Sequence, residues 1–145
     1  MEKLTPENLR EILIKLQEVN LDAVVVGGQA VNLYAYQYYQ KSDQLQQYLP
    51  FASEDLDFYG GKIEAIICQE TLGGKVILNR DFDPSPNAGI VLVDYQKQTL
   101  RIDFLASVYG LNDAEITGTA LTFLGKDKLE NIKLKVLQVL PNMLC

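Results

Sequence analysis

The stretch AVVVGGQAVN, residues 23–32, decides how this chain folds. Its first four residues form a short run rich in β-branched valine, which predicts a buried strand. The strand ends at Gly27-Gly28, and from Gln29 to about Gln40 apolar residues recur at helical spacing. We therefore expect a strand, a tight glycine turn and a helix, with the backbone of the turn open to close approach by a ligand.

A second predicted strand, residues 55–58 within the segment SEDLDF (residues 53–58), carries two aspartates. Because successive side chains of a strand point to opposite faces, Asp55 and Asp57 share one face while Leu56 and Phe58 share the other. The apolar pair can pack against helices, which leaves the two carboxylates side by side. They repel each other unless a cation lies between them, and hard oxygen ligands of this kind suit Mg²⁺. A solvated strand face is the alternative interpretation.

A third acid follows in LRIDF, residues 100–104, where the same alternation buries the apolar residues and presents Arg101 and Asp103. On a strand next to the first two acids, Asp103 would complete a site for two Mg²⁺ ions, one activating the attacking oxygen and one steadying the leaving group. Two alternatives stay open. Asp103 and Arg101 can form a surface ion pair, or Asp94 can pair with Arg101 across a hairpin of simple register, which makes Asp94 structural.

The double glycine Gly27-Gly28 precedes the acidic strand and has a possible role in binding phosphate. Amides at the start of a helix are free to hold a phosphate, and glycine lets the phosphate come close. The sequence lacks the Gly-Lys-Ser/Thr of a Walker loop and the G-x-G-x-x-G of dinucleotide folds. A tight strand-to-helix turn explains two glycines equally well when they stand alone. Followed by a strand with paired aspartates, they indicate a phosphate cradle beside a metal site.

The rest of the chain predicts an α/β (α+β) fold, a short mixed sheet flanked by helices, in one domain over residues 1–145. Thr5-Pro6-Glu7 is typical of a helix start. We expect helices over 6–20, 29–40 and 63–72, a helical turn over 112–116, strands over 23–26, 55–58, 76–78, 89–95, 99–105, 121–124 and 132–140, a loop over 79–87, and a short helix or loop insertion over 41–48.

Composition narrows the possible chemistry. The net charge is −6 and the chain has no histidine, which excludes Ser-His-Asp and Cys-His catalysis and His-ligated zinc. An acidic chain of this kind is a poor general binder of nucleic acid, but it suits a protein that concentrates divalent cations. Two distant cysteines, Cys68 in an apolar stretch and Cys145 at the end, predict neither a disulfide framework nor a zinc site. With no signal peptide and no membrane span in the sequence, we expect a cytoplasmic protein without membrane contact.

The glycine turn and the strand with paired acids together resemble a known family. VGGQAVN at residues 26–32, followed by SEDLDF at residues 53–58, is similar to the signature of the DNA polymerase β-like nucleotidyltransferase superfamily. The similarity is greatest to bacterial stand-alone nucleotidyltransferases related to abortive-infection toxins, and it covers roughly residues 20–110. It implies a short mixed sheet, Mg²⁺, a nucleoside triphosphate, and transfer of a nucleoside monophosphate to an acceptor hydroxyl on RNA or protein.

The resemblance also implies roles for particular residues. The nucleotide would be held by Gly27, Gly28, Gln29 and Ser53. The metal ions, two of them being plausible, and the catalysis would depend on Asp55, Asp57 and Asp103. Lys126, Lys128 and Arg80 are the basic residues considered for the triphosphate, although a solvated turn explains each of them as well.

Two features depart from the family pattern. The gap between Gly28 and Asp55 is longer than in the minimal motif, and the sequence stops at Cys145, where the closest members continue into C-terminal helices. We therefore expect a domain that lacks those helices. The alternative to an enzyme is an inactive or partner-completed nucleotide-binding or interaction module, as in a toxin-antitoxin system. Its partner, or a second copy of the chain, would dock on the apolar C-terminal residues Val136, Leu137, Val139 and Leu140.

Overall fold

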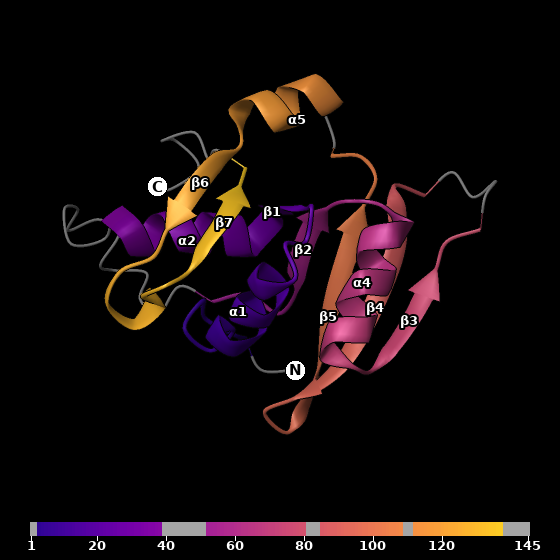
Figure 1. Ribbon diagram of the computed structural model, residues 1–145, viewed down its shortest axis with the longest axis horizontal. Helices are drawn as coiled ribbons and strands as arrows, with labels where there is room; N and C mark the ends of the chain where they lie inside the picture. The colour runs from indigo at the N-terminus through magenta and orange to yellow at the C-terminus, as the bar shows by residue number, and fades with distance from the viewer. Residues whose placement is uncertain (1–2, 39–51, 81–84, 109–111, 138–145) are drawn as a thin grey trace.

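The computed structural model describes residues 3–38, 52–80, 85–108 and 112–137. Over these ranges the chain forms four α-helices, one short 3-10 helix and a seven-stranded sheet (Figure 1). The helices are α1 (Arg10–Glu18), α2 (Gly27–Tyr38), α4 (Lys62–Leu72), α5 (Asp113–Thr119) and the 3-10 helix η2 (Asp127–Leu129). The strands are β1 (Val24–Val26), β2 (Leu56–Tyr59), β3 (Lys75–Leu78), β4 (Asn87–Tyr95), β5 (Gln98–Leu105), β6 (Leu121–Leu124) and β7 (Lys133–Val136).

The sheet is mixed, with the strand order β3-β4-β5-β2-β1-β7-β6. Strands β2 and β5 pair in parallel, as do β1 and β7, and the other neighbours are antiparallel. Helices lie on both sides of the sheet, so the predicted α+β fold with a mixed sheet flanked by helices is confirmed. The two strands that carry the aspartates are direct neighbours at its centre.

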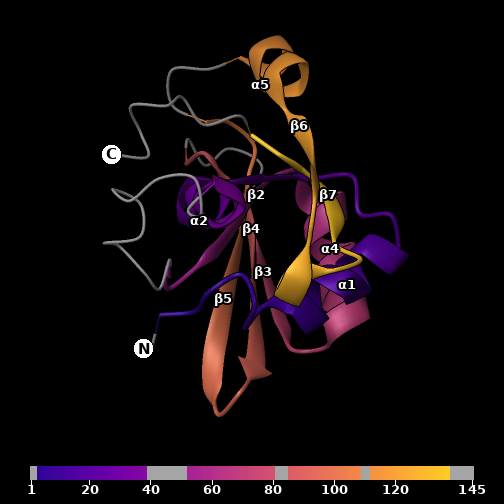
Figure 2. The same cartoon turned by 90° about the vertical axis from the view of Figure 1, so that its left-hand side faces the viewer.

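The helices divide between the two faces of the sheet (Figure 2). Helix α4 packs on β3, β4 and β5 and contacts α1, whereas α2 packs on β1 and β2 from the opposite side. Strands β2 and β5 point Leu56, Phe58, Ile102 and Phe104 into the core under α1 and α4, all of them buried. The Phe58 and Phe104 rings stack there with their centroids 5.4 Å apart. Their alternate neighbours face the α2 side.

Two predicted helix starts are moved by local chemistry. Helix α2 begins at Gly27, two residues before the expected Gln29, so both glycines belong to its first turn. Helix α1 begins at Arg10, after a turn in which Thr5 and Asn8 bond reciprocally, each side chain accepting from the other's backbone N–H at 3.1 and 3.0 Å. Thr5 therefore caps a turn that precedes the helix.

Most of the other predicted elements are found close to their expected bounds. The 112–116 turn is a helix that Asn112 and Glu115 start with a capping box. The predicted 132–140 strand is seen as Lys133–Val136, and residues 138–145 lie outside the described ranges, as do the predicted 41–48 insertion and residues 81–84 of the predicted loop. Asn87 belongs to β4, not to that loop.

Two smaller expectations concern cysteines and membranes. Cys68 is fully buried in the core, where burial raises the pKa of its thiol to about 12, which leaves it a packing residue. Cys145 lies outside the described ranges. Among the helices that the structure describes, none combines the length and the apolar character needed to cross a bilayer.

Candidate active site

Asp57 and Asp103 lie directly opposite each other on the parallel strands β2 and β5. The same register pairs Phe58 with Phe104 on the next rung. The rung that turns two carboxylates toward α2 is therefore followed by one that packs two apolar rings under α1 and α4. The predicted alternation of β2 and β5 is confirmed in this respect. Their pairing brings the two acids into one site.

The close approach changes the acidity of both aspartates on β2's side of the site. Burial, repulsion by Asp103 and a hydrogen bond to Asp103 raise the pKa of Asp57 to about 7. Burial first, and then the Asp103 charge, also raises the pKa of Asp55, which stands just before β2. Asp103 itself is only 7% exposed. The site therefore concentrates negative charge in a place with little water.

Asp103 is held by two residues besides Asp57. Asn87 donates from Nδ2 to Oδ1 at 2.9 Å, and Arg101 donates from Nε to both carboxylate oxygens at 3.1 and 3.0 Å. The Arg101 Nη2 atom also lies 3.0 Å from Oδ1, and these contacts raise the pKa of Arg101. The ion pair considered from the sequence thus exists, but Asp103 is buried and not presented on the surface as expected. Asn87 and Arg101 cover it.

The predicted pairing of Asp94 with Arg101 is wrong. In the β4–β5 hairpin Asp94 stands opposite Thr99, and Arg101 stands opposite Leu92. Arg101 is instead two residues before Asp103 on the same face of β5 and donates hydrogen bonds to it.

Gly27 brings the start of α2 onto the carboxylates. Its φ is +68°, and a Cβ built on it would lie 2.6 Å from Asp57 Oδ2. Glycine is required here on two grounds, the left-handed backbone and the lack of space. The first amides of a helix have no partner within the helix, and its N-terminus carries partial positive charge. This end of α2 consequently lies against Asp57.

Gly28 makes a second close approach, to Ser53. A Cβ on Gly28 would lie 2.5 Å from Ser53 Oγ, which accepts a hydrogen bond from Asn32 Nδ2 at 3.0 Å. Asn32 also donates to Gln29 Oε1 at 3.1 Å, and the buried Gln29 donates to the backbone carbonyl of Leu4 at 2.9 Å. The backbones of Leu4 and Ser53 form an isolated antiparallel bridge, and the Gln29 side chain ties α2 to it. The predicted role of Gln29 in holding a nucleotide therefore falls to its backbone amide.

All seven residues predicted for the site lie around the start of α2 and the β2–β5 pair. Asp57, Asp103 and Gly27 meet directly, whereas Asp55 acts on the other two carboxylates through its charge. Within the described ranges no three acidic or thiol side chains lie close enough together to hold a metal ion by protein ligands alone. The arrangement offers two adjoining carboxylates and a nearby third.

Two residues of the site were not predicted, Asn87 and Asn32. Asn87 reaches Asp103 because the β4–β5 register shifts between Asn87 and Gly89, an irregularity without a sequence pattern of its own. Asn32 does carry a signal in hindsight, since it is a polar residue between apolar neighbours of α2, and a buried polar side chain needs a hydrogen-bond partner.

Other predicted contributors lie elsewhere. Lys126 and Lys128 belong to the connection between β6 and β7, Arg80 follows β3, and none of these three forms an ion pair in the described ranges. Val136, expected to seek a partner, is instead buried in the core as part of β7. Leu137 donates its backbone N–H to Val25, and Val139 and Leu140 lie outside the described ranges.

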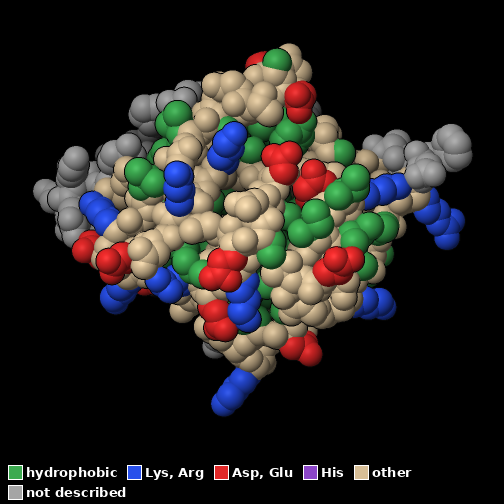
Figure 3. All heavy atoms as spheres, viewed as in Figure 1, with side chains coloured by type: hydrophobic (Ala, Val, Ile, Leu, Met, Phe, Trp, Pro, Cys, Tyr) green, Lys and Arg blue, Asp and Glu red, His purple; other side chains and the backbone are tan. Residues whose placement is uncertain are grey.

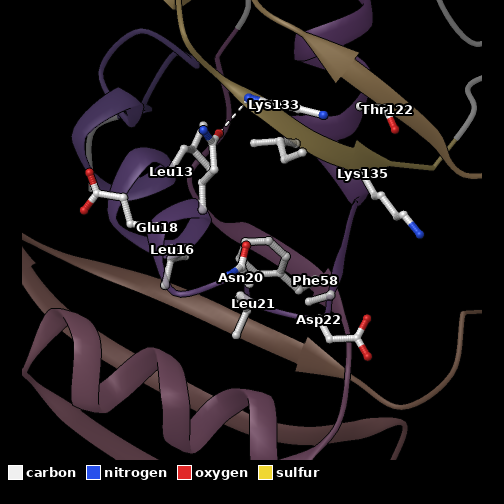
Figure 4. A pocket seen from close by; sticks show the side chains of 13 residues that line it. Leu13, Leu16, Glu18, Asn20, Leu21, Asp22, Phe58, Thr122, Lys133 and Lys135 are labelled. Carbon is white, nitrogen blue, oxygen red and sulfur yellow. Dashed lines mark hydrogen bonds between the residues drawn. The ribbon is translucent and has the colours of Figure 1, made fainter.

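A large hollow of about 760 Å³ lies away from the carboxylates, between α1, β7 and the Phe58 side of the sheet (Figure 4). Leu13, Leu16 and the Phe58 ring line its inner part, and Gln17 accepts a hydrogen bond at its edge from the Lys133 backbone at 2.6 Å. On the face seen in Figure 3, acidic and basic side chains are interspersed, with no basic patch.

Comparisons with protein families, with curated proteins and with solved structures found no match. What this arrangement can do chemically follows from its residues alone. Two adjoining carboxylates, one with a pKa of about 7, form a pair that can hold a proton or a cation between them.

Proposed function

We propose that this chain is a Mg²⁺-dependent nucleotidyltransferase of the DNA polymerase β-like kind. One observation carries the proposal, the contact between Asp57 and Asp103 directly beside Gly27 at the start of α2. It unites the two halves of the sequence resemblance, the glycine turn and the acidic strands, in one place.

The donor set supports Mg²⁺. This ion is commonly bound by one or two carboxylates and takes its remaining ligands from water and substrate phosphates, so it does not need three protein acids in one cluster. Asp57 and Asp103 are the two carboxylates that would hold it, and Asp55 at the edge is the third acid available for a second ion. Burial and then repulsion by Asp103 raise the pKa of Asp57, and a cation there would stabilise the ionised carboxylate against both effects.

The residues divide the work as follows. The amides of Gly27, Gly28 and Gln29 would cradle the triphosphate at the start of α2, with Ser53 beside them. Bound Mg²⁺ would offset the triphosphate charge and lower the pKa of the acceptor hydroxyl. The acceptor oxygen attacks the α-phosphorus, the bond from that phosphorus to the β-phosphate bridging oxygen breaks, and pyrophosphate leaves. The hydroxyl proton passes to a carboxylate of the cluster.

The test is incubation with each of the four nucleoside triphosphates, labelled on the α-phosphate, together with Mg²⁺ and with RNA or protein acceptors. We expect label on an acceptor and matching pyrophosphate release from the wild type. Asp57→Asn and Asp103→Asn should each lose at least about a hundredfold in rate, because each removes a metal ligand.

Asp94→Asn is the matched control, since Asp94 is an exposed acid on the same hairpin as Asp103. It should keep full activity. Labelling that persists in the Asp55→Ala/Asp57→Ala double variant would contradict the proposal. Whether label appears on RNA or on protein decides the acceptor class.

A second candidate function is nucleotide binding without turnover. It is favoured by the Arg101–Asp103 ion pair, because this pair supplies Asp103 with a cation from the protein itself. In that case calorimetry would show Mg²⁺-nucleotide binding to the wild type and no pyrophosphate release with any acceptor. Such a result would assign the chain to a binding module, of the kind that a partner protein completes.

A further inference from the structure

The position of Arg101 points to a function for this residue within the proposed site. Its guanidinium spans both oxygens of Asp103, and its charge also acts on Asp55 and Asp57. The Arg101 guanidinium therefore supplies the positive charge that, in the proposed function, a metal ion supplies to these carboxylates.

The sheet register explains why Arg101 faces the acids. Arg101 and Asp103 are two residues apart on β5 and share a face, and Asp57 stands opposite Asp103 on β2. On the other side, the Arg101 rung continues through Leu92 on β4 to Lys75 on β3. Lys75 is thus a cation on the same rung and face, two strands farther from the carboxylates, or about 10 Å.

We propose that Arg101 is the resident counter-cation of the carboxylate site and exchanges partners when substrate binds. Before substrate binds, it neutralises Asp103 through the observed ion pair. As Mg²⁺ takes Asp103, the guanidinium is released and binds a phosphate of the nucleoside triphosphate that arrives with the metal. This inference rests on the proposed function. It identifies Arg101 as the basic residue that binds the triphosphate, a role for which the sequence alone suggested other residues.

The side chain is suited to such an exchange. The side chain of Arg101 is 47% exposed whereas the side chain of Asp103 is 9% exposed, so the arginine can move while the aspartate stays. Its planar fork donates two parallel hydrogen bonds equally well to a carboxylate and to a phosphate. Because the ion pair is partly solvated, its contribution to stability is small, and the guanidinium can leave Asp103 at little cost.

The alternative cations are less favourably placed. Of the four basic residues considered for the site, Arg80, Lys126 and Lys128 make no ion pair in the described ranges, and Arg101 does. Lys126 and Lys128 precede and follow the start of η2, near the Gly125 turn, and Arg80 lies past the end of β3. None belongs to the strands that carry the carboxylates.

The experiment measures two affinities separately by calorimetry on the full chain: Mg²⁺ alone, and a non-hydrolysable nucleoside triphosphate analogue with saturating Mg²⁺. In Arg101→Gln we expect Mg²⁺ alone to bind about fivefold tighter, because the competing ion pair is gone. The nucleotide analogue should bind about tenfold weaker, because a charged hydrogen bond to phosphate is lost. Arg101→Lys should fall between Arg101→Gln and the wild type in both affinities.

Lys75→Gln is the matched control. This substitution also removes one positive charge, but from a position two strands farther from the carboxylates. It should change either affinity by less than about twofold. A melting curve of each variant checks that the chain is folded. If Arg101→Gln does not fold, the same two affinities are measured on Arg101→Lys.

The two proposals fail in different ways. If the wild type binds both ligands and the Arg101 variants bind them equally well, the exchange is overturned and the proposed function stands. Weaker binding of both ligands in Arg101→Gln and in Arg101→Lys overturns the exchange too. That result would mean that Arg101 only holds Asp103 in position for the ligands. If the wild type binds neither ligand, both proposals are overturned.

Discussion

Gly27 and Asp57 touch so closely that a methyl group on the glycine would lie 2.6 Å from a carboxylate oxygen. This contact joins the two parts of the sequence that seemed chemically informative, the β1–α2 turn and the acidic strand β2. It also makes the glycine testable by stability alone, without knowledge of any substrate.

We expect Gly27→Ala to lower the free energy of unfolding by about 1–3 kcal/mol, because alanine is strained at a φ of +68° and meets Asp57. Urea unfolding followed by circular dichroism measures the loss. Gly118→Ala in α5 is the control, since its added Cβ meets nothing within 4 Å, and it should be neutral or stabilising by up to about 1 kcal/mol. Equal effects of the two substitutions would contradict the close contact.

The Gly28–Ser53 contact predicts a coupling between two substitutions. Gly28→Ala should cost about 1–3 kcal/mol through overpacking against Ser53 Oγ, and Ser53→Gly about 1 kcal/mol through loss of the Asn32 hydrogen bond. Removing the Ser53 side chain makes room for the new methyl group. The double variant should therefore be more stable than the sum of the single losses predicts, by about 1 kcal/mol in a double-mutant cycle. Strict additivity would argue against the contact.

The raised pKa of Asp57 leads us to expect that the free energy of unfolding falls with rising pH in a metal-free buffer. Its folded-state pKa is about 7, above the ordinary value of 3.8, so the folded chain holds this proton more tightly than the unfolded chain. The stability due to this group is complete below about pH 4, is lost as the pH rises to 7, and changes no further above that. Unfolding free energies measured with a chelator from pH 5 to pH 8 follow this loss.

Asp57→Asn is the matched variant, since it keeps the shape and abolishes the titration. At pH 8 it should be more stable than the wild type by about 1–2 kcal/mol, allowing for solvent screening of a partly exposed group. Added Mg²⁺ should stabilise the wild type at pH 8 and leave Asp57→Asn nearly unchanged. A pH slope that is the same in both proteins would show that Asp57 is not its source.

Asn87 lies against Asp103, so we expect that a negative charge introduced at position 87 destabilises the chain and that Mg²⁺ restores its stability. Asn87→Ala removes the 2.9 Å hydrogen bond to Asp103 and should cost about 1–2 kcal/mol. Asn87→Asp should cost more in a chelator, because it adds a carboxylate to an acidic site, and should recover stability when Mg²⁺ is added. Gln96→Glu adds the same charge at the exposed hairpin turn and should show no such recovery. Melting temperatures with and without Mg²⁺ separate these outcomes.

The alternation of residues 55–58 and 100–104 was enough to sort core residues from site residues. Phe58 and Phe104 stack in the core as their parity requires, and Asp57 and Asp103 point the other way. Such predictions succeed because the period of a strand is a local property of the backbone. The start of α2 at Gly27 was missed by two residues for a related reason, since glycine's helix propensity alone argues against a helix there.

Pairing across the sheet was not available from the sequence. The expectation for Asp94 failed because the partner of Arg101 on β4 is Leu92, which lies two residues before Asp94. Asn87 was missed because its contact depends on a register shift in β4. Register depends on contacts between residues far apart in the chain, and a slip of one residue turns every side chain to the opposite face.

By itself, the sequence determined the mixed helix and strand content, the side of each strand on which acids and apolar residues lie, and the glycine turn at Gly27-Gly28. Only the tertiary structure decided that β2 and β5 are parallel neighbours with Asp57 opposite Asp103, and that Arg101 covers Asp103. The reason is physical. Alternation and turn propensity act within a few residues, whereas the approach of two like charges has to be held by the packing of the whole sheet.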